Sequence, residues 1–135
     1  MFLEELNDKN LWNKYLDDRL EKDFISTKEK EEIKDFVENK KYQDIVNKII
    51  NNNYQFSIPY KHMISKKHSS KKRIVYTYTN EEMNLLKYIS FLLYKYDYLF
   101  NKNLYSFRKV IGVRDAVKSI IYTKNIKNMY GYKVD

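Results

Sequence analysis

The sequence predicts an α+β fold, because the spacing of its apolar residues changes twice along the chain. Helical spacing dominates residues 1–53, alternation with a period of two covers about residues 56–78, and helical spacing then returns. We expect N-terminal helices, a small antiparallel sheet with a basic hairpin, two packed helices and a strand at the C-terminus. At 135 residues the chain is one domain or part of one.

Three helices are expected in residues 1–53. A capping pair, Ser26 and Glu29, places the second at Thr27–Glu38, and the third covers about residues 41–51. The apolar positions at helical spacing are Leu11, Tyr15, Leu16 and Leu20, then Ile33, Phe36 and Val37, then Tyr42, Ile45, Val46, Ile49 and Ile50. No glycine or proline linker follows, so the end of this region is a seam within one domain.

Two antiparallel strands joined by a basic loop are expected next. Apolar and polar residues alternate on both sides of the loop KKHSSKKR, with the apolar positions at Phe56, Ile58, Tyr60 and Ile64, then Ile74, Tyr76 and Tyr78. Pro59 indicates an edge strand or the beginning of a strand.

Two further helices and a strand complete the prediction. Thr79 and Glu82 form a second capping pair, before a long core helix of about Asn80–Leu99. A clean amphipathic pattern predicts a helix over about residues 112–124, and the final MYGYKVD predicts the start of a strand.

Charge is divided unevenly along the chain. Residues 1–53 hold 10 basic and 13 acidic residues, whereas residues 54–135 hold 16 basic and 5 acidic ones, together with most of the tyrosines. Basic charge among aromatic rings suits a polyanion whose bases can stack. An AT-rich genome would also explain a chain rich in lysine, asparagine, isoleucine and tyrosine. The uneven distribution of charge favours nucleic-acid binding over this explanation.

Composition excludes several classes of protein. The absence of cysteine rules out disulfides and thiolate metal sites, and two histidines are too few for a metal cluster on this chain alone. No apolar run is long enough to span a membrane, and the acidic N-terminus lacks the apolar centre of a signal peptide. We therefore expect a cytoplasmic protein with no membrane partner.

Three short segments could carry chemistry. Five cationic residues lie within residues 66–73, where they suit phosphate binding or, alternatively, a solvated turn that protects an edge strand. Arg108 lies in a loop between helices, from which it could reach a ligand, and its neighbours Tyr105 and Phe107 could be core or stacking residues. Asp135 follows an apolar stretch, where a carboxylate could bind a metal or simply face solvent.

Taken in order, the segments KKRIVYTY, NLYSFRKVIGVRDAVKSI and YGYKVD resemble the N-terminal part of bacterial reverse transcriptases. This group includes group II intron, retron and phage-defence enzymes. The resemblance covers about residues 56–135 and implies that residues 54–135 are the fingers and the start of the palm, preceded by a helical extension, residues 1–53. It implies an N-terminal fragment of an RNA-directed DNA polymerase, inactive alone because most of the palm is absent.

The resemblance also implies roles for single residues. Lys66 and Arg73 would bind the triphosphate of the incoming nucleotide, and Lys72 and Arg108 would contact template or nucleotide. Asp135 would be the first catalytic aspartate and a ligand of Mg²⁺. The implied partners are an RNA template, a DNA or RNA primer and dNTPs.

One departure from the family's pattern indicates which branch of the family the chain resembles most. The hairpin turn is His-Ser-Ser, where group II intron enzymes usually carry glycine, and this favours a retron-like or antiviral-defence enzyme. Two other classes stay open: a small basic module that binds nucleic acid without catalysis, and a protein-interaction module that docks through its acidic helices. Only the nucleic-acid module should lose affinity steeply with added salt.

Overall fold

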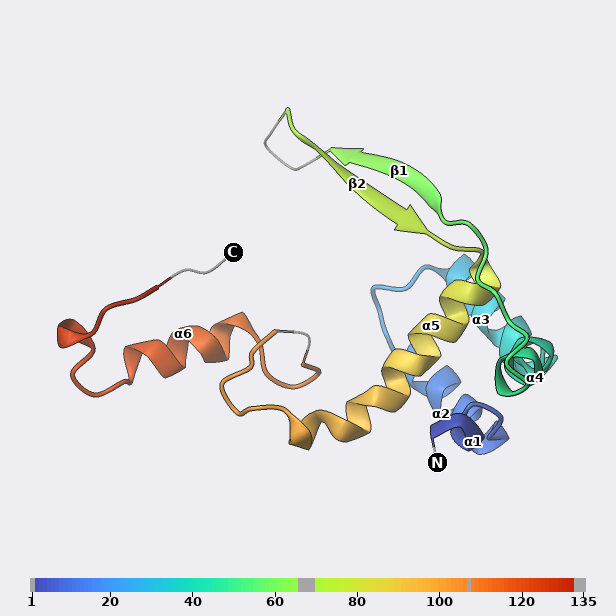
Figure 1. Cartoon of the computed structure of the whole chain (residues 1–135), viewed down its shortest axis with the longest axis horizontal. Coiled ribbons are helices and arrows are strands. Elements are labelled where there is room, and N and C mark those ends of the chain that lie inside the picture. The colour runs from blue at the N-terminus through green and yellow to red at the C-terminus, as the bar shows by residue number, and fades with distance from the viewer. Residues whose placement is uncertain (1, 66–69, 107, 133–135) are drawn as a thin grey trace. The chain divides into compact units, whose positions relative to one another are not determined.

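The computed structural model describes residues 2–65, 70–106 and 108–132 of the chain (Figure 1). It confirms the α+β fold, with six α-helices and a two-stranded antiparallel sheet in those residues. The chain forms two compact units, Met1–Leu92 and Leu93–Asp135. Residues 1–53 share one hydrophobic core with a later helix, so the first unit extends well past the seam predicted after residue 53.

The helices of the first unit lie where the apolar spacing predicts them. They are α2 (Lys9–Leu20), α3 (Thr27–Glu38), α4 (Tyr42–Ile50) and α5 (Asn80–Leu93). A short helix that the sequence did not predict, α1 (Phe2–Glu5), comes first. The predicted Asn80–Leu99 helix is α-helical only to Leu93, because a 3₁₀ segment, η1 (Tyr94–Leu99), completes it.

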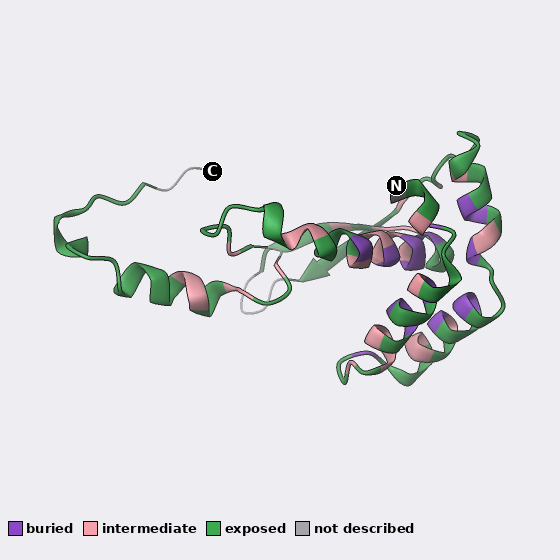
Figure 2. Cartoon of the chain, turned by 90° about the horizontal axis from the view of Figure 1, so that it is seen from below, coloured by how far each residue is buried: buried purple, intermediate pink, exposed green. Residues whose placement is uncertain are grey.

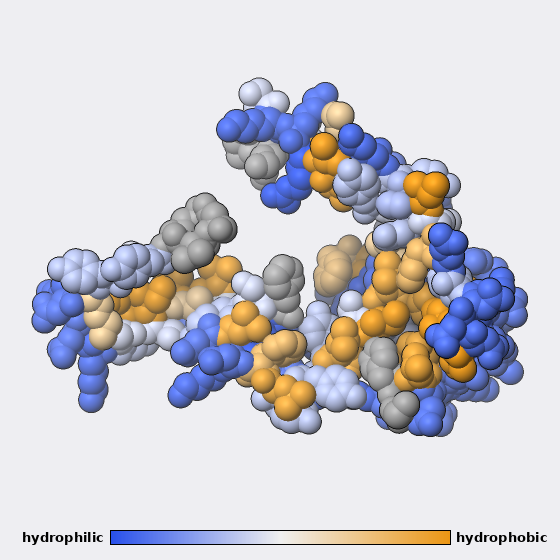
Figure 3. Space-filling view, viewed as in Figure 1, coloured by the Kyte–Doolittle hydropathy of each residue, from blue (hydrophilic) through white to orange (hydrophobic). Residues whose placement is uncertain are grey.

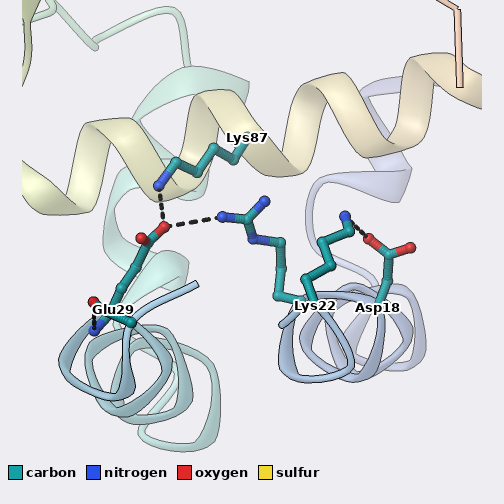
Figure 4. A network of polar contacts seen from close by, with 6 residues as sticks. Asp18, Lys22, Glu29 and Lys87 are labelled. Atoms are coloured by element: carbon teal, nitrogen blue, oxygen red, sulfur yellow. Dashed lines mark hydrogen bonds and ion pairs between the residues drawn. The ribbon is translucent and has the colours of Figure 1, made fainter. Parts of the chain in front are cut away.

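The capping pair before α3 is only half formed. The Ser26 hydroxyl accepts a hydrogen bond from the Glu29 amide at 3.3 Å. The Glu29 carboxylate does not reach back to the cap, because it is bound by the Lys87 ammonium at 2.7 Å and the Arg19 guanidinium at 2.9 Å (Figure 4). This carboxylate therefore ties α3 to α2 and α5.

Trp12 lies at the centre of the core of the first unit. Its indole is fully buried and stacks on the rings of Tyr42 and Tyr88, with centroid distances of 4.4 and 3.6 Å. Its Nε1 donates a hydrogen bond to the Leu6 carbonyl at 2.8 Å, which satisfies the one polar atom of the ring. The buried residues of α2, α3, α4 and α5 form one hydrophobic cluster that includes this stack, and Figure 2 shows where burial occurs along the helices.

The predicted hairpin is confirmed, with shorter strands than the alternation suggests. β1 (Tyr60–Ser65) pairs with β2 (Lys72–Thr77) in a register that sets Tyr60 opposite Thr77 and Ser65 opposite Lys72. Pro59 directly precedes β1, as the sequence predicts for a strand start. Phe56 lies outside the ladder and packs edge-on against Tyr54 and Tyr78.

A buried carboxylate joins the hairpin to α5. Glu82 is 4% exposed and accepts hydrogen bonds from residues on both sides of the hairpin. The donors before β1 are the Ser57 amide at 2.6 Å, the Ser57 hydroxyl and the Tyr54 hydroxyl at 3.1 Å. After β2, the Thr79 hydroxyl donates at 3.0 Å and the Thr79 amide at 3.3 Å, which confirms the second capping pair.

The second unit contains α6 (Val113–Ile121) and a 3₁₀ turn, η2 (Ile126–Asn128). None of its described residues is buried. The terminal strand predicted from MYGYKVD is not formed over residues 129–132, because no described segment pairs with them, and residues 133–135 lie outside the described part. The two helices that are expected to pack on each other, α5 and α6, belong to different units, and their packing stays a prediction.

Within the described residues, no helix has the length and apolar character needed to cross a bilayer.

We expect Glu82→Gln to weaken the fold and to change its response to acid. Burial alone would raise the pKa of Glu82, but the hydrogen bonds from Ser57, Thr79 and Tyr54 outweigh it and lower the pKa from 4.5 to about 2. The ionised carboxylate therefore stabilises the fold above about pH 4.5, and this contribution is lost as the pH falls toward 2. The substitution should cost about 2–3 kcal/mol at neutral pH.

Urea denaturation followed by Trp12 fluorescence between about pH 6 and about pH 3 measures this effect. The matched control is Glu81→Gln, because Glu81 is the exposed neighbour of Glu82 on the first turn of α5. Equal free energies of unfolding for the two variants across this range would contradict the role assigned to Glu82.

Candidate nucleic-acid interface

The hairpin concentrates positive charge on an exposed surface. From Tyr60 to Thr77 the sequence holds six basic residues and no acidic one. Every residue of β1 is exposed, and only Val75 and Thr77 of β2 are half-buried. Figure 3 shows hydrophilic and apolar side chains interspersed along this hairpin. The described part of the hairpin therefore presents cations to solvent without neighbouring carboxylates.

The register divides the hairpin residues between two faces of the sheet. Arg73 lies opposite Ile64, on the face where the His62 Nε2 and Thr77 Oγ1 atoms are 2.9 Å apart. Lys72 lies opposite Ser65, on the other face, which it shares with Ile74 and Tyr76. The two neighbouring cations thus point to opposite sides of the strand pair, so one flat ligand surface cannot contact both equally.

Arg73 and Lys72 are available to a ligand. Neither side chain makes a hydrogen bond or an ion pair with any other residue that the structure describes, and both residues are exposed. An arginine in this state can direct its five N–H donors at phosphate oxygens. Their assignment to nucleotide and template binding stays a prediction.

Arg108, unlike Arg73, already has partners, because its guanidinium is hydrogen-bonded within the second unit. Its Nε and a terminal nitrogen donate to the two carboxylate oxygens of Asp97, at 2.5 and 2.7 Å. Its other terminal nitrogen donates to the carbonyls of Asn101 and Leu104, at 3.3 and 3.4 Å. Arg108 therefore holds the loop that precedes it against the 3₁₀ segment, and its contact with template or nucleotide stays a prediction.

Three residues of the predicted site cannot be placed. Lys66, expected beside Arg73, lies outside the described residues, as does Asp135, the expected catalytic and metal-binding residue, and Phe107 of the YSFR segment. Lys72 and Arg73 are neighbours on β2, with their side chains on opposite faces of the strand pair.

The described residues contain no group of three or more histidine, cysteine or acidic side chains placed to hold a metal ion. The predicted Mg²⁺ site depends on Asp135, which lies outside the described residues, so this site stays a prediction.

Local sequence patterns do not predict two of the contacts made by carboxylates. Asp97, the partner of Arg108, is one of only 5 acidic residues in residues 54–135. Glu82 was recognised as part of a capping pair, but its bonds to Ser57 and Tyr54 span 25 and 28 residues of sequence. Carboxylates are scarce in residues 54–135, so an arginine there has few possible partners, and this scarcity is the sequence signal that points to Asp97.

Comparisons with protein-family models, with curated proteins and with solved structures found no match for this chain.

We expect Arg108→Lys to loosen the loop from Asn101 to Leu104. A lysine cannot bind both carboxylate oxygens of Asp97 and two carbonyls with fixed geometry, as the guanidinium does. Hydrogen exchange at the amides of Asn103 and Leu104, which are both hydrogen-bonded to Asn101, should become about tenfold faster.

The matched control for this change is Arg114→Lys, because Arg114 is an exposed residue of α6. Unchanged exchange at Asn103 and Leu104 in Arg108→Lys would refute the proposed role of the guanidinium in ordering the loop.

Proposed function

We propose that this chain supplies the fingers of an RNA-directed DNA polymerase of the retron-like or defence-associated kind. The observation that carries the proposal is the exposed hairpin, whose Arg73 and Lys72 have no partner among the described residues. In this proposal Arg73 binds the triphosphate of the incoming nucleotide together with Lys66, and Lys72 contacts the template. Catalysis also needs palm carboxylates, starting with Asp135, and the Mg²⁺ that they bind.

The electrostatics of the hairpin support this role. No carboxylate lies between Asp44 and Glu81 in the sequence, so no nearby acidic residue along the chain neutralises Arg73. An arginine fork can bind two phosphate oxygens at once, and its charge stabilises the negative charge that develops during phosphoryl transfer. Both faces of the strand pair are accessible, so nucleotide and template can be bound from opposite sides.

The attachment of the hairpin supports the role as well. Glu82 holds the segments on both sides of the hairpin, at Ser57 and Thr79, to the first turn of α5. A site with fixed geometry loses less entropy when a ligand binds than a flexible loop does. The base of the hairpin is thus preorganised, although its strands have no buried side chains.

A second candidate is a nucleic-acid-binding module without catalysis. It is favoured by the face of the hairpin that carries Tyr76, which is 58% exposed and lies opposite Lys61. An exposed aromatic ring beside cations suits base stacking on single-stranded nucleic acid. This function requires neither Asp135 nor dNTPs.

Both candidates predict that Lys72→Ala weakens binding to single-stranded RNA, and the non-catalytic module predicts the same for Arg73→Ala. Each loss of one phosphate contact should lower the slope of log affinity against log salt by about 0.7. Fluorescence anisotropy with labelled oligo(U), between about 50 and about 200 mM salt, measures this slope.

The matched control for the binding test is Lys14→Ala, an exposed lysine of α2 on the acidic half of the chain. Binding that is insensitive to salt, or slopes that Lys72→Ala and Lys14→Ala change equally, would contradict a nucleic-acid role for the hairpin.

Primer extension by the full-length protein separates the two candidates. With an RNA template, Mg²⁺ and dNTPs, we expect Arg73→Ala to slow nucleotide incorporation by about a hundredfold or more, while primer–template affinity falls much less. Equal losses in incorporation and in affinity would exclude the triphosphate role. An absence of extension by the wild-type protein, together with retained RNA binding, would leave the non-catalytic module as the function.

A further inference from the structure

We propose that a polar groove at the end of β2 binds an extended peptide segment of a partner protein. The groove has a volume of about 460 Å³ and is formed by the beginning of α3, the end of β2 and the first half of α5. This volume lies in the range of sites that bind small molecules. The inference goes beyond the proposed polymerase function, because the groove itself contains neither Arg73 nor Lys72, although a peptide that extends along β2 would also approach these two residues.

Asn84 is the first reason to regard the groove as a binding site. The residue lines the groove and is only 6% exposed, yet its side-chain amide makes no hydrogen bond with any other residue that the structure describes. An amide can donate two hydrogen bonds and accept two. The amide atoms of Asn84 are not among the fully buried atoms without a partner, so they keep contact with the solvent that fills the groove. A ligand in the groove can provide the partners that the described chain does not.

The charges in the groove determine which class of ligand fits. Lys28 and Lys87 supply two positive charges, and Glu29 and Glu32 supply two negative ones. Glu29 is bound by Lys87 and Arg19, whereas Glu32 accepts a hydrogen bond from the Asn80 amide at 3.3 Å and lies 3.9 Å from the Lys28 ammonium. The positive and negative charges of the lining balance, so the groove has no net positive charge that would attract a phosphate chain.

A peptide backbone fits the groove in two respects: it can bond to the Asn84 amide, and it brings no charge. It is uncharged, and it carries a donor and an acceptor at each residue, which can form paired hydrogen bonds with the amide of Asn84. Thr77 and Tyr78 bring the end of β2 into the wall of the groove. In the described residues the sheet has two strands, so β2 has one edge that no strand covers.

An extended peptide that leaves the groove can therefore continue along β2 as a third strand. Strand addition to an uncovered edge is a common mode of peptide recognition, in which main-chain hydrogen bonds supply affinity. The other end of β2 carries Lys72 and Arg73, so the part of the peptide that lies there should be acidic. The predicted ligand is an extended segment with acidic residues at one end.

Selection from a phage-displayed dodecapeptide library tests the proposal on the full chain. The selection is run in parallel on the wild-type chain and on Asn84→Leu, and a peptide enriched on the wild type is synthesised. We expect Asn84→Leu to weaken binding of this peptide by about tenfold or more, and the peptide to contain acidic residues toward one end. The matched control is Asn47→Leu, on the exposed face of α4, which should leave the affinity unchanged.

The folding of Asn84→Leu is checked by thermal denaturation. Because no hydrogen bond to a described residue is lost, its melting temperature should equal or exceed that of the wild type. A large decrease would show that the amide has a structural role and would overturn the assignment of Asn84 as a binding group.

Chemical-shift mapping on the isotope-labelled wild-type chain needs no variant. Added peptide should shift the side-chain amide signals of Asn84 and the backbone signals of Thr77 and Tyr78. The proposal is overturned if no peptide is enriched, if the shifted signals lie elsewhere, or if oligo(U) shifts these same signals and identifies the ligand as nucleic acid.

Discussion

The attachment of the hairpin to the helices of the first unit depends on one buried carboxylate. Glu82 is fixed on the first turn of α5, and the chain on both sides of the hairpin donates hydrogen bonds to it. A two-stranded hairpin without a covered face is marginally stable on its own in water. Because Ser57 and Thr79 share one acceptor residue, the two strand ends are held close together, and the hairpin is closed at its base by polar contacts rather than by a core.

The two units are stabilised by different forces. The first has a hydrophobic core in which Trp12 stacks on two tyrosines and helices from both halves of the sequence meet. The second has no buried residue in its described part, and the Arg108–Asp97 pair, with side chains 11% and 29% exposed, joins two of its segments. Screening by salt therefore affects the second unit more than the first.

Local sequence signals predicted the local features of the fold. The spacing of Ile33, Phe36 and Val37 and the Ser26 cap placed α3 correctly, and alternation placed the hairpin. Contacts between distant segments could not be inferred in this way. The stacking of Trp12 on Tyr88 and the bond from Ser57 to Glu82 depend on tertiary packing. At residues 129–132 alternation suggested a strand, but a strand also needs a neighbour for its hydrogen bonds, and periodicity does not report one.

The exposure of the hairpin has a consequence for how such a protein can evolve. Substitutions at Met63, Ile74 or Tyr76 remove little buried surface, because each of these side chains is at least half exposed. Stability therefore constrains these positions weakly, whereas it constrains Trp12 and Glu82 strongly. Selection can alter what the hairpin recognises in small steps without destabilising the helical unit that carries it, so sequence divergence should be concentrated in the strands.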